Sequence, residues 1–209
     1  MTVTIDGTTG VSLVQDGVVT SAKIADGAIA AADLASGAIT SAALPTGSVL
    51  QVVEASVENS SSVTTNSTSY VDSGLLTLNI TPKAAGSKIQ VTFDGYIIHL
   101  HPANGNIGGS AKIYRNVAGG SFSAVTSGHN DGMYIRAAGN LAQNDWFDVK
   151  GHSRCIDSPT YTLGNQIQYK LYFRESDQNT ASFHINHSGG LVEQGDAPTI
   201  IAVATEIAG

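Results

Sequence analysis

The sequence contains very little that could cross-link a fold. Among its 209 residues only Cys155 is a cysteine, so no disulfide can form within one chain. A chain without such cross-links is stabilised by packing or by association with other chains. The thiol of Cys155 lies beside Arg154, which leaves two interpretations: a reactive thiolate with a lowered pKa, or an inert thiol. We expect the inert thiol.

Charge is also scarce. Charged residues make up 13% of the chain, and the formal net charge is −7. A mildly acidic surface is unsuited to a nucleic-acid backbone or an anionic membrane, so we expect neither as a partner. No apolar run is long enough to span a bilayer, and we expect no membrane insertion. The opening residues MTVTIDGTTG lack the basic start and the apolar core of a secretory signal.

A ten-residue repeat occupies residues 16–48. Aligned on their glycines, three consecutive copies are DGVVTSAKIA, DGAIAAADLA and SGAITSAALP. A degenerate copy begins at Asp6, and a truncated one begins at Thr46. Large aliphatic residues recur at every fifth position, namely at Val14, Val19, Ile24, Ile29, Leu34, Ile39, Leu44 and Val49.

A spacing of five suits neither a regular helix nor a regular strand. In a helix, five residues advance by about 140°, so the aliphatic residues form no stripe. In a strand, an odd spacing sends successive side chains to opposite faces. We therefore expect each repeat to combine a short extended piece with one helical turn, which Thr20 or Ser21 would cap and Gly27 would end at positive φ.

A single ribbon of this kind is too thin to bury its aliphatic side chains. Three chains wound around a common axis would bury them, at about 1.5–3 kcal/mol for each side chain. We therefore expect a homotrimeric stalk over residues 16–48. Its trimer interface would consist of Val19, Ile24, Ile29, Leu34, Ile39 and Leu44. The alternative is a flexible linker, but a linker has no reason to keep aliphatic residues in register.

Residues 49–209 follow a different pattern, in which apolar and polar residues alternate. The apolar members include Ile89, Val91, Phe93 and Ile97, and then Ile167, Tyr169, Leu171 and Phe173. Turn signals rich in Gly, Pro, Asn and Asp separate these runs, and helix formers are scarce. We expect an all-β fold, in which residues 49–209 form a jelly-roll-like antiparallel β-sandwich head. The last strand, around Ile201 and Val203, is expected to pair with the first, Val49 to Val53.

Four aromatic residues fall on the polar side of the alternation. Where the aliphatic residues point inward, we expect the aromatic side chains to point outward at Tyr96, Tyr134, Trp146 and Tyr172. A monomer seldom exposes so many aromatic side chains. We favour a subunit interface that includes Tyr96, Trp146 and Tyr172. The alternative is a platform on which sugars stack.

The chain contains no familiar catalytic or cofactor motif. It lacks a Gly-x-Ser-x-Gly elbow, a phosphate-binding glycine loop and His-Glu-x-x-His, so we expect neither an enzyme nor a bound cofactor. Only His99 and His101 have a metal-like spacing, because residues i and i+2 of a strand share a face. The alternation puts His99 in phase with Ile97, on the side expected to face the core. We therefore favour hydrogen-bonded histidines over a metal site.

Several segments resemble the tail-fibre proteins of tailed bacteriophages. They are TIDGTTGV, DGAIAAADLASGAIT, LPTGSVLQVVEA, TSYVDSGLLTLNITPKAAGSKIQVTF, DSPTYTLGNQIQYKLYFRES and IIAVATEIAG, which come from essentially the whole chain. The resemblance implies a thin trimeric shaft and a globular β head. It also implies that residues 1–15 join the virion, that the head reaches toward the host surface, and that the chain is made in the host cytoplasm.

Two functions remain open at this point. The first is a homotrimeric tail fibre, attached to a tail, baseplate or capsid protein, whose head binds a glycan or a protein of the host surface. We expect its receptor-binding residues among Asn104, Asn106, Asn130, Asp131 and Tyr134. The second is a structural virion component without receptor binding, such as a capsid head fibre, a capsid decoration or a baseplate adaptor. A bacterial adhesin with a trimeric stalk is less favoured.

Overall fold

Strands dominate the chain. The computed structural model describes residues 22, 24–58, 63–101, 107–126, 134–137, 147–175, 182–185 and 199–209. Contacts divide the chain into two compact units, residues 1–43 and 44–209. None of the helical turns in the described residues has the length and hydropathy to span a bilayer. The expected all-β fold is confirmed.

In the described part of residues 24–48, the local conformation repeats every ten residues. Gly27, Gly37 and Gly47 all have positive φ, between 75° and 90°. Positive φ is the conformation expected of Gly27. Each glycine lies in a tight turn closed by a backbone hydrogen bond, from Ala28 to Ala25, from Ala38 to Ala35 and from Ser48 to Pro45. Short 3-10 turns, η2 (Ala31–Asp33) and η3 (Ser41–Ala43), lie between the glycine turns.

The aliphatic side chains of this repeat lie open to solvent in the single chain. Ile24, Ile29, Leu34, Ile39, Leu44 and Val49 expose between 38% and 57% of their surface. Val19 lies outside the described residues, as does the expected attachment segment 1–15. A single copy of the repeat therefore leaves a row of exposed apolar groups.

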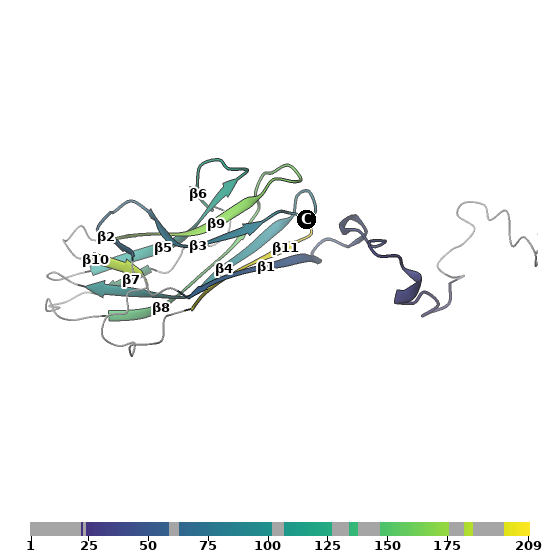
Figure 1. The fold of residues 1–209 in the computed structure, drawn as a ribbon, viewed down its shortest axis with the longest axis horizontal. Coiled ribbons are helices and arrows are strands. Elements are labelled where there is room, and N and C mark those ends of the chain that lie inside the picture. The colour runs from purple at the N-terminus through teal and green to yellow at the C-terminus, as the bar shows by residue number, and fades with distance from the viewer. Residues whose placement is uncertain are drawn as a thin grey trace, which may run out of the picture. The chain divides into compact units, whose positions relative to one another are not determined.

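Two antiparallel sheets form the second unit and face each other across one core (Figure 1). The six-stranded sheet contains β1 (Val49–Glu58), β2 (Val63–Thr65), β4 (Lys88–His101), β8 (Phe147–Asp157), β10 (Ser182–Ile185) and β11 (Thr199–Ile207). The five-stranded sheet contains β3 (Val71–Ile80), β5 (Ile107–Val117), β6 (Ser123–Ala124), β7 (Tyr134–Ala137) and β9 (Ile167–Glu175). The expected antiparallel β-sandwich is confirmed.

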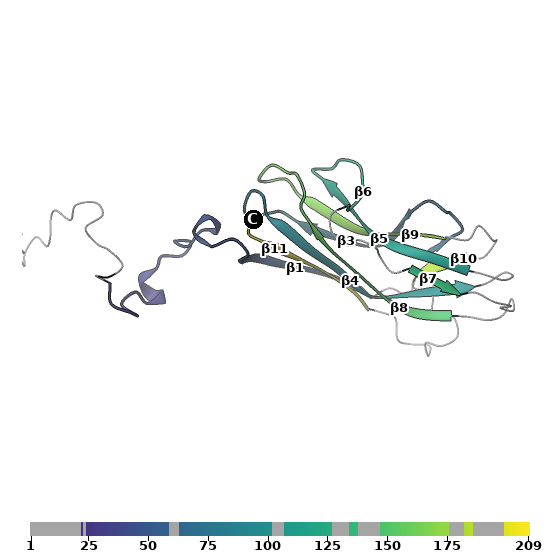
Figure 2. The ribbon, with the colours of Figure 1, turned by 180° about the vertical axis from the view of Figure 1, so that it is seen from behind.

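Strand pairing brings the two ends of this unit together. The six-stranded sheet has the order β1-β11-β4-β10-β2, and β8 pairs with the other edge of β4, as Figure 2 shows from behind. The five-stranded sheet has the order β3-β9-β5-β6, and β7 pairs with β5. Val53 of β1 lies opposite Ala204 of β11. The expected pairing of the first and last strands is therefore confirmed.

The inner faces of the two sheets supply the core. Its largest fully buried aliphatic and phenylalanine side chains are Leu78, Ile80, Ile89, Phe93, Ile98, Ile113 and Phe173. Most of these side chains occupy alternate positions along their strands, because successive residues of a strand face opposite sides of the sheet. The alternation in the sequence therefore identified the core face of β9 and of the first half of β4. In β11, however, the buried residues are Ile200, Ala202 and Ala204, and Ile201 is 41% exposed.

The alternation breaks in the middle of β4, at Gly95. Asp94 pairs with His152 and Tyr96 pairs with Gly151. Gly95 is therefore an extra residue that has no pairing partner in β8. It has φ 86°, and a Cβ atom there would overlap the backbone oxygen of Thr199. Such a bulge shifts the phase of the strand by one residue.

The bulge overturns the expected direction of Tyr96. The Tyr96 side chain is fully buried, as is Ile98, whereas Ile97 is only half-buried. The Tyr96 ring lies against Gly151, and its hydroxyl is 2.6 Å from the Ser153 hydroxyl. Burial raises the pKa of Tyr96 to about 12. Tyr96 is therefore a core residue. The prediction that its side chain points outward, as a trimer contact would require, is wrong.

A buried carboxylate connects the two sheets near the end of β8. Asp157 accepts hydrogen bonds from Arg115 of β5, at 2.6 and 2.8 Å, and from the Tyr169 hydroxyl of β9, at 2.8 Å. Cys155 is buried nearby, and burial, followed by the negative charge of Asp157, raises the pKa of its thiol to about 12. The thiol is therefore protonated at neutral pH, as expected for an inert cysteine.

A second buried carboxylate fixes the turn between β3 and β4. The Glu206 side chain of β11 accepts hydrogen bonds from the backbone of Lys83 and Ala84, the Ser87 hydroxyl and the Gln51 amide. Burial alone would raise the pKa of Glu206, but these hydrogen bonds outweigh it and the pKa is lowered. The charged form is therefore part of the folded structure.

We predict that Gly151→Ala destabilises the sandwich, because the new methyl group would displace the Tyr96 ring. Overpacking of this kind costs about 1–3 kcal/mol, measured as the free energy of unfolding in urea. Gly120→Ala is the matched control, since a Cβ there meets only the Val117 carbonyl oxygen, at 3.3 Å. Equal losses in the two variants would contradict the assigned packing.

We predict that Glu206→Gln lowers stability at pH 7 by about 2–4 kcal/mol, because it removes a hydrogen-bonded buried charge. The pKa of Glu206 is lower in the folded chain than its usual value of 4.5, so its contribution is complete above that pH. It is lost as the pH falls through the folded pKa. The difference in free energy of unfolding between wild type and variant, measured in urea, should be smaller at pH 3 than at pH 7. An equal difference at the two pH values would contradict this role of the Glu206 charge.

Candidate functional site

The outer face of the five-stranded sheet carries a group of aromatic and basic side chains. In β5 and β9 the core positions are occupied by residues such as Ile113 and Leu171. The residues between them therefore face outward. The outward residues are Ser110, Lys112, Tyr114 and Asn116 of β5, and Gln168, Lys170, Tyr172 and Arg174 of β9.

Strand register brings the two outward tyrosines together. Lys112 lies opposite Tyr172, and Tyr114 lies opposite Lys170, so the tyrosines are diagonal neighbours. Their rings stack at 4.0 Å between centroids, with 17° between the planes. Tyr70 packs beside Tyr114 at 5.8 Å, and Phe122 packs beside Tyr172 at 6.0 Å. We call Tyr70, Tyr114, Tyr172 and Phe122 the aromatic row.

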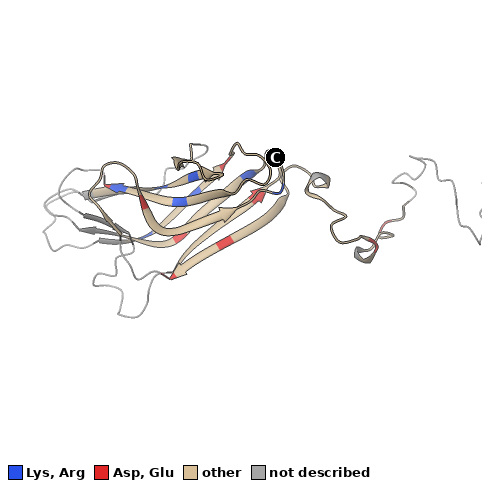
Figure 3. Ribbon diagram, turned by 45° about the horizontal axis from the view of Figure 1, so that its top comes forward, with Lys and Arg blue, Asp and Glu red and all other residues tan. Residues whose placement is uncertain are grey.

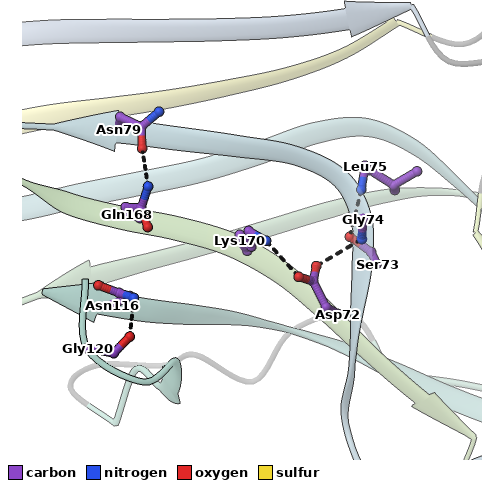
Figure 4. Close-up of polar contacts among 9 residues, drawn as sticks. All are labelled: Asp72, Ser73, Gly74, Leu75, Asn79, Asn116, Gly120, Gln168 and Lys170. Atoms are coloured by element: carbon purple, nitrogen blue, oxygen red, sulfur yellow. Dashed lines mark hydrogen bonds and ion pairs between the residues drawn. The ribbon is translucent and has the colours of Figure 1, made fainter. Parts of the chain in front are cut away.

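Three cations lie over the ends of the aromatic row. Arg174 and Lys112 lie 4.8 and 5.5 Å from the centre of the Tyr70 ring, and Lys170 lies 5.0 Å from that of Phe122. Cations at these distances are attracted to the electron-rich face of the ring. Lys170 also pairs with Asp72 at 2.7 Å, as Figure 4 shows.

Tyr114 and Tyr172 keep their protons at neutral pH. Burial raises the pKa of Tyr114, and the neighbouring tyrosines raise it further, although Arg174 opposes the shift. Burial also raises the pKa of Tyr172, helped by Asp72 and opposed by Lys170. Both hydroxyl groups therefore donate as well as accept hydrogen bonds.

Beyond the aromatic row the same face is polar and uncharged. Gln168 donates a hydrogen bond to Asn79 at 3.0 Å. The Asn116 side chain holds the turn that leads to β6, because it donates to the Gly120 carbonyl (Figure 4) and accepts from the Gly119 backbone. The polar side chains at this end of the face thus form their hydrogen bonds within the chain. The other end of the face carries Lys112 and Arg174.

The basic residues of this face contrast with the chain as a whole, which has a net charge of −7. Figure 3, in which the upper side of Figure 1 comes forward, shows basic positions on strands of the sandwich as well as acidic ones. In the described part of the chain, neither Lys112 nor Arg174 forms an ion pair with a carboxylate. An anionic ligand would find two unneutralised positive charges here.

Of the aromatic residues expected to point outward, two lie on this face. Tyr172 is in the aromatic row, where its contacts are with rings of its own chain. Tyr134 of β7 lies opposite Ser110, and its side chain is 59% exposed. Trp146 lies outside the described residues, as do Asn104, Asn106, Asn130 and Asp131.

The histidine pair has a different setting from the expected one. The structure describes only the backbone of His99 and His101, which lie near the end of β4. Both are in phase with the half-buried Ile97, and the bulge at Gly95 means that this phase is not the core phase. No group of three or more potential metal ligands occurs among the residues that the structure describes.

Sequence reasoning missed most of the aromatic row. Tyr70 precedes β3 and Phe122 precedes β6, so neither belongs to an alternating run, and Tyr114 was not singled out. A partial signal was present in the sequence, because KIY and KLY place a lysine two residues before a tyrosine in two separate strands. Only the pairing of β5 with β9 shows that these motifs meet.

Comparison with known proteins identifies no family. No protein-family model and no curated protein matches the chain. Among solved structures, particles derived from infectious bursal virus match at 15% identity and a TM-score of 0.35, covering 76% of this chain and 36% of that one. The VP2 subviral particle of infectious bursal disease virus matches at 12% identity and a TM-score of 0.31, covering 76% and 38%.

A carbohydrate-binding module is also among the similar structures. The CBM22-1 xylan-binding domain of Paenibacillus barcinonensis Xyn10C matches at 12% identity and a TM-score of 0.25, covering 79% of this chain and 99% of that one. This chain spans little more than a third of the length of the virus chains that it matches. With TM-scores below 0.5, these likenesses carry no argument about the function of this chain.

We predict that Tyr114 and Tyr172 stabilise the fold jointly. A double-mutant cycle of Tyr114→Leu and Tyr172→Leu should give a coupling free energy of about 0.5–1.5 kcal/mol in urea unfolding, because the stacked pair is lost with either ring. A cycle of Tyr172→Leu with the distant, exposed Leu163→Ala should give none. Additive losses in the first cycle would contradict the stacked arrangement.

Proposed function

We propose that this chain is a subunit of a homotrimeric virion appendage, a bacteriophage tail fibre whose β-sandwich head recognises the host cell surface. The observation that carries the proposal is the row of exposed aliphatic residues between Ile24 and Leu44, which recurs with a repeated backbone conformation. Burial of such side chains stabilises an assembly by about 25 cal/mol for each Å² removed from water. Sister chains offer equivalent rows at the same spacing.

The sandwich supports the recognition part of the proposal. Tyr114 and Tyr172 of the aromatic row and the exposed Tyr134 belong to strands of one sheet, and aromatic side chains lose little conformational entropy when they bind. A trimer would present three copies of this face. Three weak contacts that engage together give far tighter attachment than any one of them.

The alternative is a structural virion component without receptor binding. It is favoured by the contacts of the aromatic row, because these rings already pack on one another and on cations of the same chain. In that case the chain would associate with virus particles and its head would bind no cell.

We predict that the purified chain binds susceptible bacterial cells and competes with infection. Labelled protein should saturate the cell surface, and an excess of unlabelled protein should reduce plaque formation. Ile39→Asp should weaken cell binding by about tenfold or more, because a charge among the stalk aliphatics removes the multivalent attachment. The head should keep its unfolding midpoint.

Ser36→Asp is the matched control for this variant. It adds the same charge three residues away, at a position where the two preceding repeats have Asp16 and Asp26. It should bind cells as the wild type does. A chain that joins virus particles but neither binds cells nor blocks infection would reject host recognition and leave the structural alternative.

A further inference from the structure

We infer that one end of the outer face, formed by Tyr134, Lys112 and Arg174, binds a sugar that carries a carboxylate group. This inference rests on the proposed function, since it names the class of host-surface ligand that the head would recognise. We call these three residues the cationic patch. Its evidence is the register of three strands, the exposure of one ring and the surroundings of one guanidinium group.

Register places the three residues around one buried serine. Tyr134 of β7 and Arg174 of β9 both lie opposite Ser110 of β5, one on each side. Neighbouring strands are about 4.8 Å apart, so the backbones of Tyr134 and Arg174 are roughly 10 Å apart across β5. Lys112 is two residues beyond Ser110 on the same face, about 7 Å along the strand.

Arg174 is held in place by its surroundings. Its Nε donates to the Ser110 hydroxyl at 3.3 Å, and one terminal nitrogen donates to the Thr68 carbonyl at 3.4 Å. The guanidinium lies over the Tyr70 ring, whose hydroxyl is 2.7 Å from the Ser110 hydroxyl. These contacts fix the orientation of the group before a ligand arrives, which lowers the entropy cost of binding.

The chemistry of the cationic patch matches an acidic sugar. The N–H groups of the Arg174 guanidinium that do not donate to Ser110 or Thr68 can donate to a carboxylate, and the Lys112 ammonium adds a second positive charge. Tyr134, at 59% exposure, supplies an open ring face against which the apolar face of a sugar can pack. The charge of Lys170 is already matched by Asp72, so that lysine does not belong to the cationic patch.

A nucleic acid does not fit this face, because it would need a longer run of positive charge and the chain has 10 basic and 17 acidic side chains. Two cations beside one exposed ring suit a single charged sugar unit. The expected affinity of one site is weak, on the order of 1 mM, and three heads would add to it.

The test is a ligand-observed NMR titration of the full-length chain with three oligosaccharides, of glucuronic, galacturonic and mannuronic acid. Each is paired with its neutral parent, an oligomer of glucose, galactose or mannose. At least one acidic oligomer should bind about tenfold more tightly than its parent, and the binding should weaken as salt rises. Equal binding of acid and parent, or no binding at all, overturns the inference.

Variants then locate the site. Lys112→Gln combined with Arg174→Gln should reduce binding of the acidic oligomer by about tenfold or more, and Tyr134→Ala should also reduce it. Lys88→Gln combined with Arg154→Gln removes two cations from the outer face of the other sheet and should have no effect, as should Leu163→Ala. If the double variant fails to fold, Lys112→Gln alone and Tyr134→Ala carry the test. Unchanged binding in the patch variants overturns the inference.

The same variants separate this inference from the proposed function. Suppose that the wild type and the patch variants bind cells equally well and that neither binds acidic sugars. This result would overturn the assignment of the cationic patch as a sugar site and would leave host recognition intact. Binding of an acidic oligomer that depends on the patch, in a chain that never binds cells, supports the site and contradicts the tail-fibre function.

Discussion

A two-layer sandwich can bury only one face of each of its sheets, and this constraint shapes the rest of the molecule. The inner faces are filled by aliphatic and aromatic side chains and tied together by Arg115, Asp157 and Tyr169. The outer faces must be stable in water or be covered by something else. On the five-stranded sheet, the outer side chains satisfy much of their bonding among themselves, through stacked rings and the paired Lys170 and Asp72.

The ten-residue repeat also has apolar side chains that need to be buried, but it has no second sheet to cover them. Its turns are closed by glycine at positive φ and by single backbone hydrogen bonds, which fix the path of the chain but leave the aliphatic side chains between Ile24 and Leu44 38–56% exposed. In the proposed trimer, the stability of this segment comes from contacts with sister chains. The proposed trimer thus supplies for residues 16–48 what the facing sheet supplies for the head, and it raises the number of binding faces from one to three.

The sequence predicted the elements whose pattern is local. The glycine spacing predicted the positive φ of Gly27. Alternation located the core positions of β9 and of the first half of β4 but not those of β11, where Ile200, Ala202 and Ala204 are buried and Ile201 is exposed. It failed at Gly95, because one inserted residue reverses every later side chain of a strand, and Tyr96 therefore lies in the core. The aromatic row depends on the register between strands, which no local pattern specifies.

The central claim is that the aliphatic residues between Ile24 and Leu44 are buried between identical chains. Light scattering coupled to size-exclusion chromatography of the full-length protein tests it most directly, because molar mass counts the chains without reference to any ligand. The account predicts a single species of three times 21.5 kDa that persists on dilution. A species of 21.5 kDa at every concentration would contradict it.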